Sequence, residues 1–343
     1  MKKQNDKVSP VLNEFFAEYL PNTKGLRENS ILAYKYAFRL LFGYLQEEKG
    51  IDAENVTFKT LSGGTVESFL LYLEKQRKCS VKTRNIRRAA IVAFAKFAAK
   101  KHFDISLPFY SAVIEMPRKR EPKTKTVKYF TTEEVSLLLN LPNASYALGQ
   151  RDVTLLSLLY ASGARVQEIC DLTLSGISFG NPTKIKLIGK GGKPRSVTIP
   201  DNCAAILTSY LKSMEMDVRS KGANTKFLFQ SQRNPQMSLA CVEEIVEKYV
   251  TQAKKKYPDL FKQKRYTPHS FRHSIAVHML EAGESLVSIK AFLGHASIAT
   301  TVIYAQVSPE LANRYLDERG KPLPEEPALR KPQPLAQALP FLY

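Results

Sequence analysis

Residues 267–283 read TPHSFRHSIAVHMLEAG, and this stretch decides how the rest of the sequence is interpreted. Pro268 marks an expected helix start, and the apolar residues that follow recur at three- and four-residue spacing up to Gly283. His269 and Arg272 stand near the start of that expected helix. Alone, such a histidine is more often an ordinary surface residue, so its meaning depends on what else the chain supplies.

Four further residues of matching chemistry are dispersed along the chain. They are Arg165 in ASGARVQE, Lys190 in the turn IGKGGK, His295 in LGHAS and Tyr304 in TTVIY. Guanidinium groups donate paired hydrogen bonds to phosphate and stay charged, and preorganised donors of this kind stabilise charge that develops in a transition state. Each residue alone has an ordinary reading as a surface, turn or core residue. Their order and neighbours together favour a reaction at a phosphodiester.

Tyr304 is the candidate nucleophile of this set. A tyrosine hydroxyl has an ordinary pKa of about 10 and needs a base to take its proton, for which a histidine is suited. A lysine on a mobile turn can return a proton to the departing sugar oxygen. The predicted product is a covalent phosphotyrosyl intermediate that keeps the bond energy for rejoining.

These motifs resemble those of the tyrosine recombinases, or integrase family of site-specific DNA recombinases, and especially the simple Xer-like members. The resemblance extends from about residue 10 to about residue 320. ASGARVQEICDL is similar to the motif of the first catalytic arginine, TPHSFRH to the His-x-x-Arg box, and LGHASIATTVIYAQV to the closing motif with the nucleophile. The resemblance implies these catalytic residues: Arg165, Lys190, His269, Arg272, His295 and Tyr304, with Glu168 in support.

The resemblance implies a role for each member of this set. Tyr304 attacks the scissile phosphate and leaves a 3′-phosphotyrosine and a free 5′-hydroxyl, and strand exchange passes through a Holliday junction. Arg165 and Arg272 hold the phosphate, and His295 donates a further hydrogen bond. The remaining roles are His269 as the base toward Tyr304, Lys190 as the acid for the leaving oxygen, and Glu168 as the residue that orients its neighbours.

The fold implied is mainly α, a two-domain clamp with the DNA breaking-rejoining enzyme fold. Its parts are a SAM-like helical core-binding domain over residues 1–116, a basic linker over 117–128, a mixed α/β catalytic domain with a small antiparallel sheet over 129–320, and a Pro-rich tail over 321–343.

Periodicity in the chain agrees with this plan. Helices are predicted over residues 11–20, 30–48, 64–76, 81–102, 131–141, 201–214, 238–257, 270–283, 285–294 and 308–320, and a β-hairpin over 184–200. Asn29 or Ser30, Thr65, and Thr131 or Thr132 are predicted helix N-caps.

Basic residues outside the catalytic set are candidates for DNA contact. Lys82, Arg84, Arg87 and Arg88 lie at the start of the helix predicted over residues 81–102, where a solvated face is the alternative, and the resemblance favours DNA. Arg118, Lys119 and Arg120 lie in the linker, where basic side chains can follow phosphates and release counterions.

The implied partner is double-stranded DNA with a specific recombination site, bound by a homotetramer or by a hetero-oligomer with a paralogue. The event served stays open among integration or excision, transposition and chromosome-dimer resolution. Two other functions are considered. A type IB topoisomerase-like enzyme is disfavoured by the compact helical N-terminal domain, and a catalytically silent DNA-binding protein by the complete catalytic set.

Composition supports a polyanionic partner. The formal net charge is +19 and the isoelectric point is near 9.6. The start of the chain lacks the pattern of a signal peptide, and no apolar run approaches the roughly 20 residues of a membrane span. We therefore expect no membrane association and a bacterial cytoplasmic, nucleoid-associated enzyme.

No cofactor is predicted. IGKGGK fails the P-loop pattern, because Lys184 occupies the first glycine position and Gly191 the position that needs a hydroxyl. The four cysteines are scattered without a Cys-x-x-Cys pair, which argues for a reducing compartment and against zinc. No acidic cluster suits Mg²⁺, so no metal site is expected.

Overall fold

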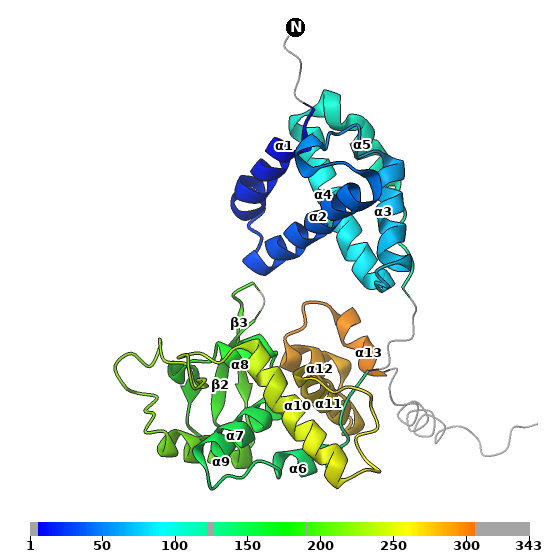
Figure 1. Cartoon of the computed structure of the whole chain (residues 1–343). Helices are drawn as coiled ribbons and strands as arrows, with labels where there is room; N and C mark the ends of the chain where they lie inside the picture. The colour runs from blue at the N-terminus through cyan, green and yellow to red at the C-terminus, as the bar shows by residue number, and fades with distance from the viewer. Residues whose placement is uncertain (1–5, 122–126, 190, 306–343) are drawn as a thin grey trace, which may run out of the picture. The chain divides into compact units, whose positions relative to one another are not determined.

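The protein is described by a computed structural model that covers residues 6–121, 127–189 and 191–305 (Figure 1). The chain divides into two compact units, Met1–Lys125 and Thr126–Tyr343. This division lies inside the linker predicted over residues 117–128. Lys190, the helix predicted over 308–320 and the tail 321–343 lie outside the described residues.

Helices build the N-terminal unit (Figure 1). Its α-helices are α1 (Val8–Glu14), α2 (Glu28–Lys49), α3 (Gly63–Lys75), α4 (Val81–Lys101) and α5 (Phe103–Glu115), with a π-helix over Phe15–Thr23 and a short 3₁₀ turn over Ala53–Asn55. The four helices predicted in this region are confirmed. The sequence did not predict α5, because Pro108 lies inside it and proline disfavours helix interiors.

Three predicted helix caps have different outcomes. The prediction of Asn29 or Ser30 was wrong, because α2 begins at Glu28 and Arg27 is its N-cap, so both residues lie inside the first turn. Ser62, not Thr65, is the N-cap of α3, and its hydroxyl accepts a hydrogen bond from the backbone N–H of Thr65 at 3.3 Å. The prediction was wrong by three residues because α3 begins with two glycines that weaken its sequence signal. Thr131 is confirmed as the cap of α6 (Thr132–Leu139), in a reciprocal capping box with Glu134.

Phenylalanines fill the core of the N-terminal unit. The ring of Phe94, on α4, has its centroid 5.4 Å from that of Phe15, 5.2 Å from Phe38, 6.1 Å from Phe58 and 6.1 Å from Phe109. Edge-to-face and tilted aromatic contacts of this kind add to the stabilisation from burial. Helix α4 is therefore the central element of this unit.

The second unit combines helices with a small sheet. Its further elements are α7 (Ala147–Ala161), α8 (Val166–Cys170), β1 (Ile177–Ser178), β2 (Lys184–Ile188), β3 (Pro194–Thr198), α9 (Asp201–Ser213), α10 (Leu239–Lys256), α11 (Pro268–Glu281), α12 (Leu286–Leu293) and α13 (Val302–Ala305), with 3₁₀ turns over Leu174–Gly176 and Ile298–Thr300. The helices predicted between residues 201 and 294 are confirmed.

The sheet has the order β1-β2-β3 with antiparallel pairing. The predicted hairpin is confirmed as β2 and β3, whereas the two-residue β1 was too short to predict. Ile185 pairs with Val197 and Leu187 with Arg195, so Arg195 occupies a position on the buried face of the hairpin. A charged residue at such a position needs a buried partner.

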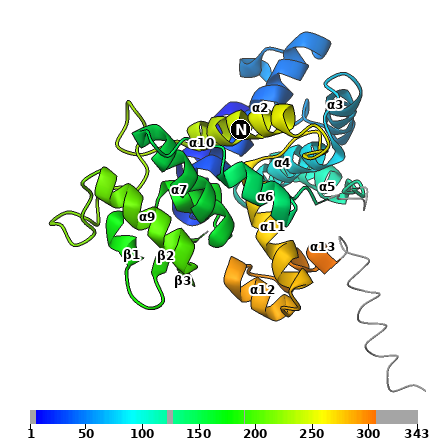
Figure 2. The same ribbon diagram turned by 90° about the horizontal axis from the view of Figure 1, so that it is seen from below.

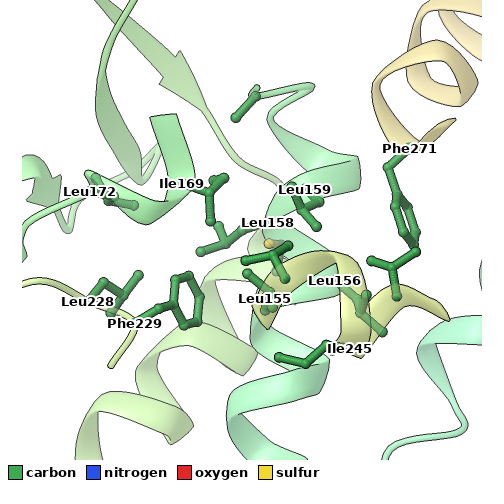
Figure 3. Packing of buried hydrophobic residues seen from close by; sticks show 14 of the residues in the cluster. Leu155, Leu156, Leu158, Leu159, Ile169, Leu172, Leu228, Phe229, Ile245 and Phe271 are labelled. Carbon is green, nitrogen blue, oxygen red and sulfur yellow. The ribbon is translucent and has the colours of Figure 1, made fainter. Parts of the chain in front are cut away.

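Helix α7 supplies the centre of the catalytic unit's core (Figure 3). Its buried leucines and their neighbours are Leu155, Leu156, Leu158, Leu159, Ile169, Leu172, Leu228, Phe229, Ile245 and Phe271. Since these side chains come from α7, α8, α10, α11 and connecting segments, one core fixes the elements that carry Arg165, His269 and Arg272.

A smaller apolar cluster joins α11, α12 and α13. These three helices lie together at one side of the unit (Figure 2). The buried members of the cluster are Val127, Ala276, Val277, Leu280, Ile289, Leu293 and Tyr304. The candidate nucleophile is therefore part of a packed cluster.

Candidate active site

The turn between α7 and α8 positions Arg165. Gly163 has φ +55°, and a Cβ atom there would lie 2.8 Å from a methyl group of Leu293, so only glycine fits this turn. The hydroxyl of Ser162 accepts a hydrogen bond from the backbone N–H of Ala164 at 3.2 Å. Arg165 then becomes the N-cap of α8, with its side chain partly exposed.

Glu168 is the buried carboxylate around which two arginines gather. Its Oε1 accepts from Nη1 of Arg165 at 2.9 Å, and its Oε2 accepts from the Arg165 backbone N–H at 2.8 Å. Arg195 donates through both terminal nitrogens, at 2.7 and 2.8 Å. Burial alone would raise the pKa of Glu168, but the hydrogen bonds from Arg195 and Arg165 outweigh it and lower the pKa. Glu168 stays ionised and fixes the Arg165 guanidinium.

Arg195 was missed by the sequence analysis. It links the hairpin to α8 through Glu168, and its side chain also packs against Gly294, where a Cβ would lie 2.9 Å from the Arg195 Cδ. The available signal was the alternation of the strand, which puts a charge on the inward face at position 195. That signal predicts a buried partner without saying which one.

Arg272 is buried almost completely, with 1% of its surface exposed. Nη1 donates to the carbonyl oxygen of Gly163 at 2.5 Å, and Nη2 donates to that of Leu293 at 2.8 Å. Burial, with a smaller contribution from the charge of Arg165, lowers the pKa of Arg272 to about 10. Arg272 therefore connects α11 to the turn that positions Arg165 and to the end of α12.

His295 follows the left-handed Gly294 (φ +65°) that ends α12. Its Nδ1 lies 2.8 Å from the hydroxyl of Thr301, which orients the ring. Burial lowers the pKa of His295 to about 4, with contributions from Arg272 and Arg165. The ring is neutral at neutral pH, so it can donate a hydrogen bond from one nitrogen.

Tyr304 is 1% exposed, and its hydroxyl lies 3.0 Å from Nδ1 of His273. Burial raises the pKa of Tyr304, while the charges of Arg272 and Arg165 lower it to a smaller extent. The structure therefore places the phenol within the electrostatic reach of both predicted arginines. His273 was not among the predicted residues, although it follows Arg272 directly and lies one helical turn after His269.

His269, the predicted base, is exposed near the start of α11, and its ring centroid lies 4.5 Å from that of His273. Desolvation of the ring lowers the pKa of His269, and the charges of Arg272 and Arg165 add to this effect. The structure puts His273, and not His269, at hydrogen-bond distance from Tyr304.

The turn that carries Lys190 is closed by its flanking residues. The N–H of Gly189 donates to the carbonyl of Lys193 at 2.8 Å, and Gly191 and Gly192 have φ of +86° and +75°. Lys190 itself lies outside the described residues. The remaining predicted catalytic residues and Glu168 belong to one unit, on α8, α11, α13 and the segment after α12.

Comparison with known proteins identifies the family. The phage integrase family model matches residues 128–310, and the model of the phage integrase N-terminal SAM-like domain matches residues 13–102. The chain belongs to the phage integrase family. It is a tyrosine-type site-specific DNA recombinase, built from a SAM-like N-terminal domain and a catalytic domain of the family's fold.

Similar members of the family cover most of this chain. The tyrosine recombinase XerD of Haemophilus influenzae is 30% identical over 312 residues, which are 91% of this chain and 96% of the relative. The tyrosine recombinase XerC of Anoxybacillus flavithermus is 29% identical over 306 residues, 89% of this chain and 95% of the relative.

Solved structures share the fold. The XerH site-specific recombinase bound to its palindromic difH substrate has a TM-score of 0.67 at 20% identity, covering 92% of this chain and 89% of that one. The Tn1549 transposon integrase in complex with transposon right-end DNA has a TM-score of 0.63 at 17% identity, covering 90% of this chain and 98% of that one.

The arginines at the start of α4 in this recombinase contact main-chain carbonyls. Arg84 is buried and donates to the carbonyl of Pro117 at 3.2 Å. Arg87 donates to the carbonyl of Ala33 at 3.0 Å, and Arg88 to that of Met116. The sequence analysis assigned all three to DNA. Arg84 has a contact within the fold because it is buried and hydrogen-bonded to a main-chain carbonyl, and its contact with DNA stays a prediction.

Exposed basic residues remain on the same unit. Lys82 is exposed in the first turn of α4, and Arg118, Lys119 and Arg120 are exposed beyond α5. Arg118 forms an ion pair with Glu121 at 2.8 Å, and Lys119 forms one with Glu74 at 2.6 Å. Surface pairs of this kind contribute little to stability, so these cations can exchange a carboxylate for phosphate at low cost.

Two absences hold for the part of the chain that the structure describes. No cluster of three or more His, Cys, Asp or Glu side chains there could hold a metal ion. No single helix within the described ranges is long and apolar enough to cross a membrane. Helix α12 and residues 298–305 reach that length and apolar character only together, and they are sharply bent against each other.

Proposed function

We propose that this recombinase cuts and rejoins duplex DNA at a specific site through a 3′-phosphotyrosyl intermediate on Tyr304 and a Holliday junction. The observation that carries the proposal is that the buried Tyr304 phenol lies within the electrostatic reach of the buried Arg272 and of Arg165, which Glu168 holds. Chemistry of this kind needs a nucleophile and phosphate-binding cations in one place, and this unit supplies both.

The site is prepared for an anion. Burial lowers the pKa of His269 and His295, and the charges of Arg272 and Arg165 lower it further, as expected in a positive local field. A phosphodiester bound there would offset this field and would accept hydrogen bonds from the guanidinium groups. Because those groups are already oriented by protein partners, little reorganisation accompanies the reaction.

Each step of cleavage then has a residue assigned to it. The Tyr304 oxygen forms a bond to phosphorus while the bond from phosphorus to the 5′-oxygen breaks. Arg165, Arg272 and His295 stabilise the charge on the nonbridging oxygens. The phenolic proton passes to His269, and Lys190 gives a proton to the 5′-oxygen. Rejoining is the reverse of these steps with a new 5′-hydroxyl.

The burial of Tyr304 adds a condition to this mechanism. With 1% of its surface exposed, the residue cannot meet a phosphate without a shift of the short helix α13. We propose that binding of the DNA site drives this shift and that the working form is a homotetramer on two sites.

A trapped adduct tests the proposal. A duplex that carries the recombination site with a nick just beyond the scissile phosphate loses its short 5′-hydroxyl product, so the covalent complex accumulates. We expect the adduct with wild-type protein in EDTA without ATP, and none with Tyr304→Phe, whose DNA affinity should be nearly unchanged because many phosphate contacts supply it. An adduct with the Phe variant would remove Tyr304 as nucleophile. Relaxation of supercoiled DNA without joining of two duplexes would favour the topoisomerase-like alternative.

A further inference from the structure

His273 is the one histidine of the site that touches the candidate nucleophile. Its Nδ1 lies 3.0 Å from the Tyr304 hydroxyl, and the two rings meet edge to face with centroids 5.6 Å apart. It projects from α11 four residues after His269, so both rings lie on one helical face. Neither the predicted catalytic set nor the mechanism above uses it.

We propose that His273 is a positioning residue for the proposed nucleophile, and that it holds the Tyr304 hydroxyl beside Arg272 by accepting its hydrogen bond through Nδ1. This inference rests on the proposed role of Tyr304. The ring would carry its proton on Nε2, which leaves Nδ1 free as acceptor.

The pKa values of His273 and Tyr304 indicate that His273 orients the Tyr304 hydroxyl and does not remove its proton. Burial lowers the pKa of His273 to about 4, with further contributions from His269, Arg272 and His295. Burial also raises the pKa of Tyr304 above its ordinary value. Transfer of the proton from the phenol to His273 is therefore strongly unfavourable in the DNA-free protein. His273 fixes the direction of the hydroxyl and keeps it protonated, and the base must be another group or act after phosphate has bound.

The backbone around His273 is rigid enough for this role. Arg272 is anchored to the carbonyls of Gly163 and Leu293. Ser274, fully buried, donates to the carbonyl of Ser270 and accepts from the backbone N–H of Phe130, both at 2.8 Å. With both neighbours fixed, and with the His269 ring packed edge to face against it, the His273 ring has little freedom.

The same helix offers a matched control. His278 also uses Nδ1 to contact a tyrosine hydroxyl, that of Tyr160, at 2.9 Å. This pair joins α11 to α7 and includes none of the proposed catalytic residues. His278→Ala therefore removes a histidine–tyrosine hydrogen bond from α11 without touching Tyr304, and reports any general effect of damage to the helix.

The test compares four variants in the nicked-duplex assay under single-turnover conditions with saturating DNA. We expect His273→Ala to slow adduct formation roughly 10- to 100-fold, the loss typical of a misplaced reacting group. His273→Asn places an amide oxygen near the position of Nδ1 and should recover most of that loss. His278→Ala should stay close to the wild-type rate, and Tyr304→Phe should give no adduct.

A second measurement needs no DNA. Tetranitromethane nitrates accessible tyrosines, and mass spectrometry of the peptide with Tyr304 gives its rate of modification. We expect faster nitration of Tyr304 in His273→Ala than in wild-type protein, and no change in His278→Ala. Equal cleavage rates in wild type and His273→Ala, equal losses in the two alanine variants, or unchanged nitration of Tyr304 would each overturn the positioning role. An adduct in Tyr304→Phe would instead overturn the proposed nucleophile, whatever His273 does.

Discussion

The two units of this recombinase use arginine differently, although both carry it in sequence contexts that suggest phosphate. On α4, the side chains of Arg84, Arg87 and Arg88 end on main-chain carbonyls of neighbouring segments. In the catalytic unit, Arg165 and Arg195 converge on one buried carboxylate. The first pattern closes a helical fold, and the second prepares an electropositive site.

Arg272 combines both patterns. Like the α4 arginines it donates to carbonyls, yet it also lies within the electrostatic reach of Tyr304 and His295. The difference between a structural and a catalytic arginine is therefore not the type of partner in the DNA-free protein. What distinguishes a catalytic arginine is that a nucleophile and other cations lie near it.

The largest effect that tests this distinction is expected for Arg272→Ala. Loss of a preorganised cation at the phosphate should slow adduct formation by roughly 10³-fold or more. Two buried carbonyls also lose their donor, which should lower the free energy of unfolding by about 1–3 kcal/mol. Single-turnover cleavage and chemical denaturation measure the two effects. A rate within tenfold of wild type would assign Arg272 to the structural class.

Arg195→Met should produce the next largest effect, on stability. The variant leaves Glu168 buried with Arg165 alone, and breaking a buried pair in this way costs roughly 3–5 kcal/mol at neutral pH. The pKa of Glu168 is lowered in the folded protein, so its contribution is present above the unfolded pKa and is lost as pH falls through the folded value.

Chemical denaturation at several pH values checks the direction of this pH dependence of stability. The stability gap between wild type and Arg195→Met should shrink as pH falls through the lowered pKa of Glu168 in the folded protein, where the carboxylate becomes protonated. Adding Glu168→Gln to Arg195→Met should recover part of the loss at neutral pH, because no unpaired charge remains buried. A gap that is the same at acidic and neutral pH would mean that Arg195 acts through packing alone.

The sequence predicted elements whose signals are local. The periodic helices, the Gly-rich hairpin and the capping box at Thr131 all follow from residues near one another in the chain. The prediction failed where a longer-range contact decides the outcome. Pro108 lies within α5, whose buried Phe109 packs on Phe94, and Arg195 is acceptable on an inward face only because Glu168 lies there.

Predictions about the site were limited in the same way by contacts between distant parts of the chain. Motif resemblance indicated six catalytic residues without showing which of them touch. His273 was missed because its significance depends on α13 returning to α11, a contact that no spacing within residues 267–283 reveals. Arg84 was assigned to DNA because a basic helix start has the same composition whether its side chains face solvent or the fold.

Arg84→Ala should have a moderate effect that is confined to stability. The carbonyl of Pro117 loses its donor, at a cost of about 1–3 kcal/mol. The cleavage rate at saturating DNA should stay near wild type, and so should the salt dependence of binding. Thermal melting of the full chain and binding titrations at several salt concentrations measure these quantities. Unchanged melting together with a weaker salt dependence would return Arg84 to the DNA-contact class.

The smallest effect is expected for Lys82→Ala, which tests the proposed phosphate contact of α4. Lys82 is exposed, so its removal should leave melting unchanged. If it neutralises one phosphate, the slope of log binding constant against log salt should become shallower by about 0.9, and by the same amount on unrelated DNA. Lys49→Ala, at the exposed end of α2, is the matched control and should leave the slope unchanged. The same slope for Lys82→Ala and wild type would remove the first turn of α4 from the DNA interface. The exposed cations beyond α5, Arg118, Lys119 and Arg120, would then be the remaining candidates in this unit.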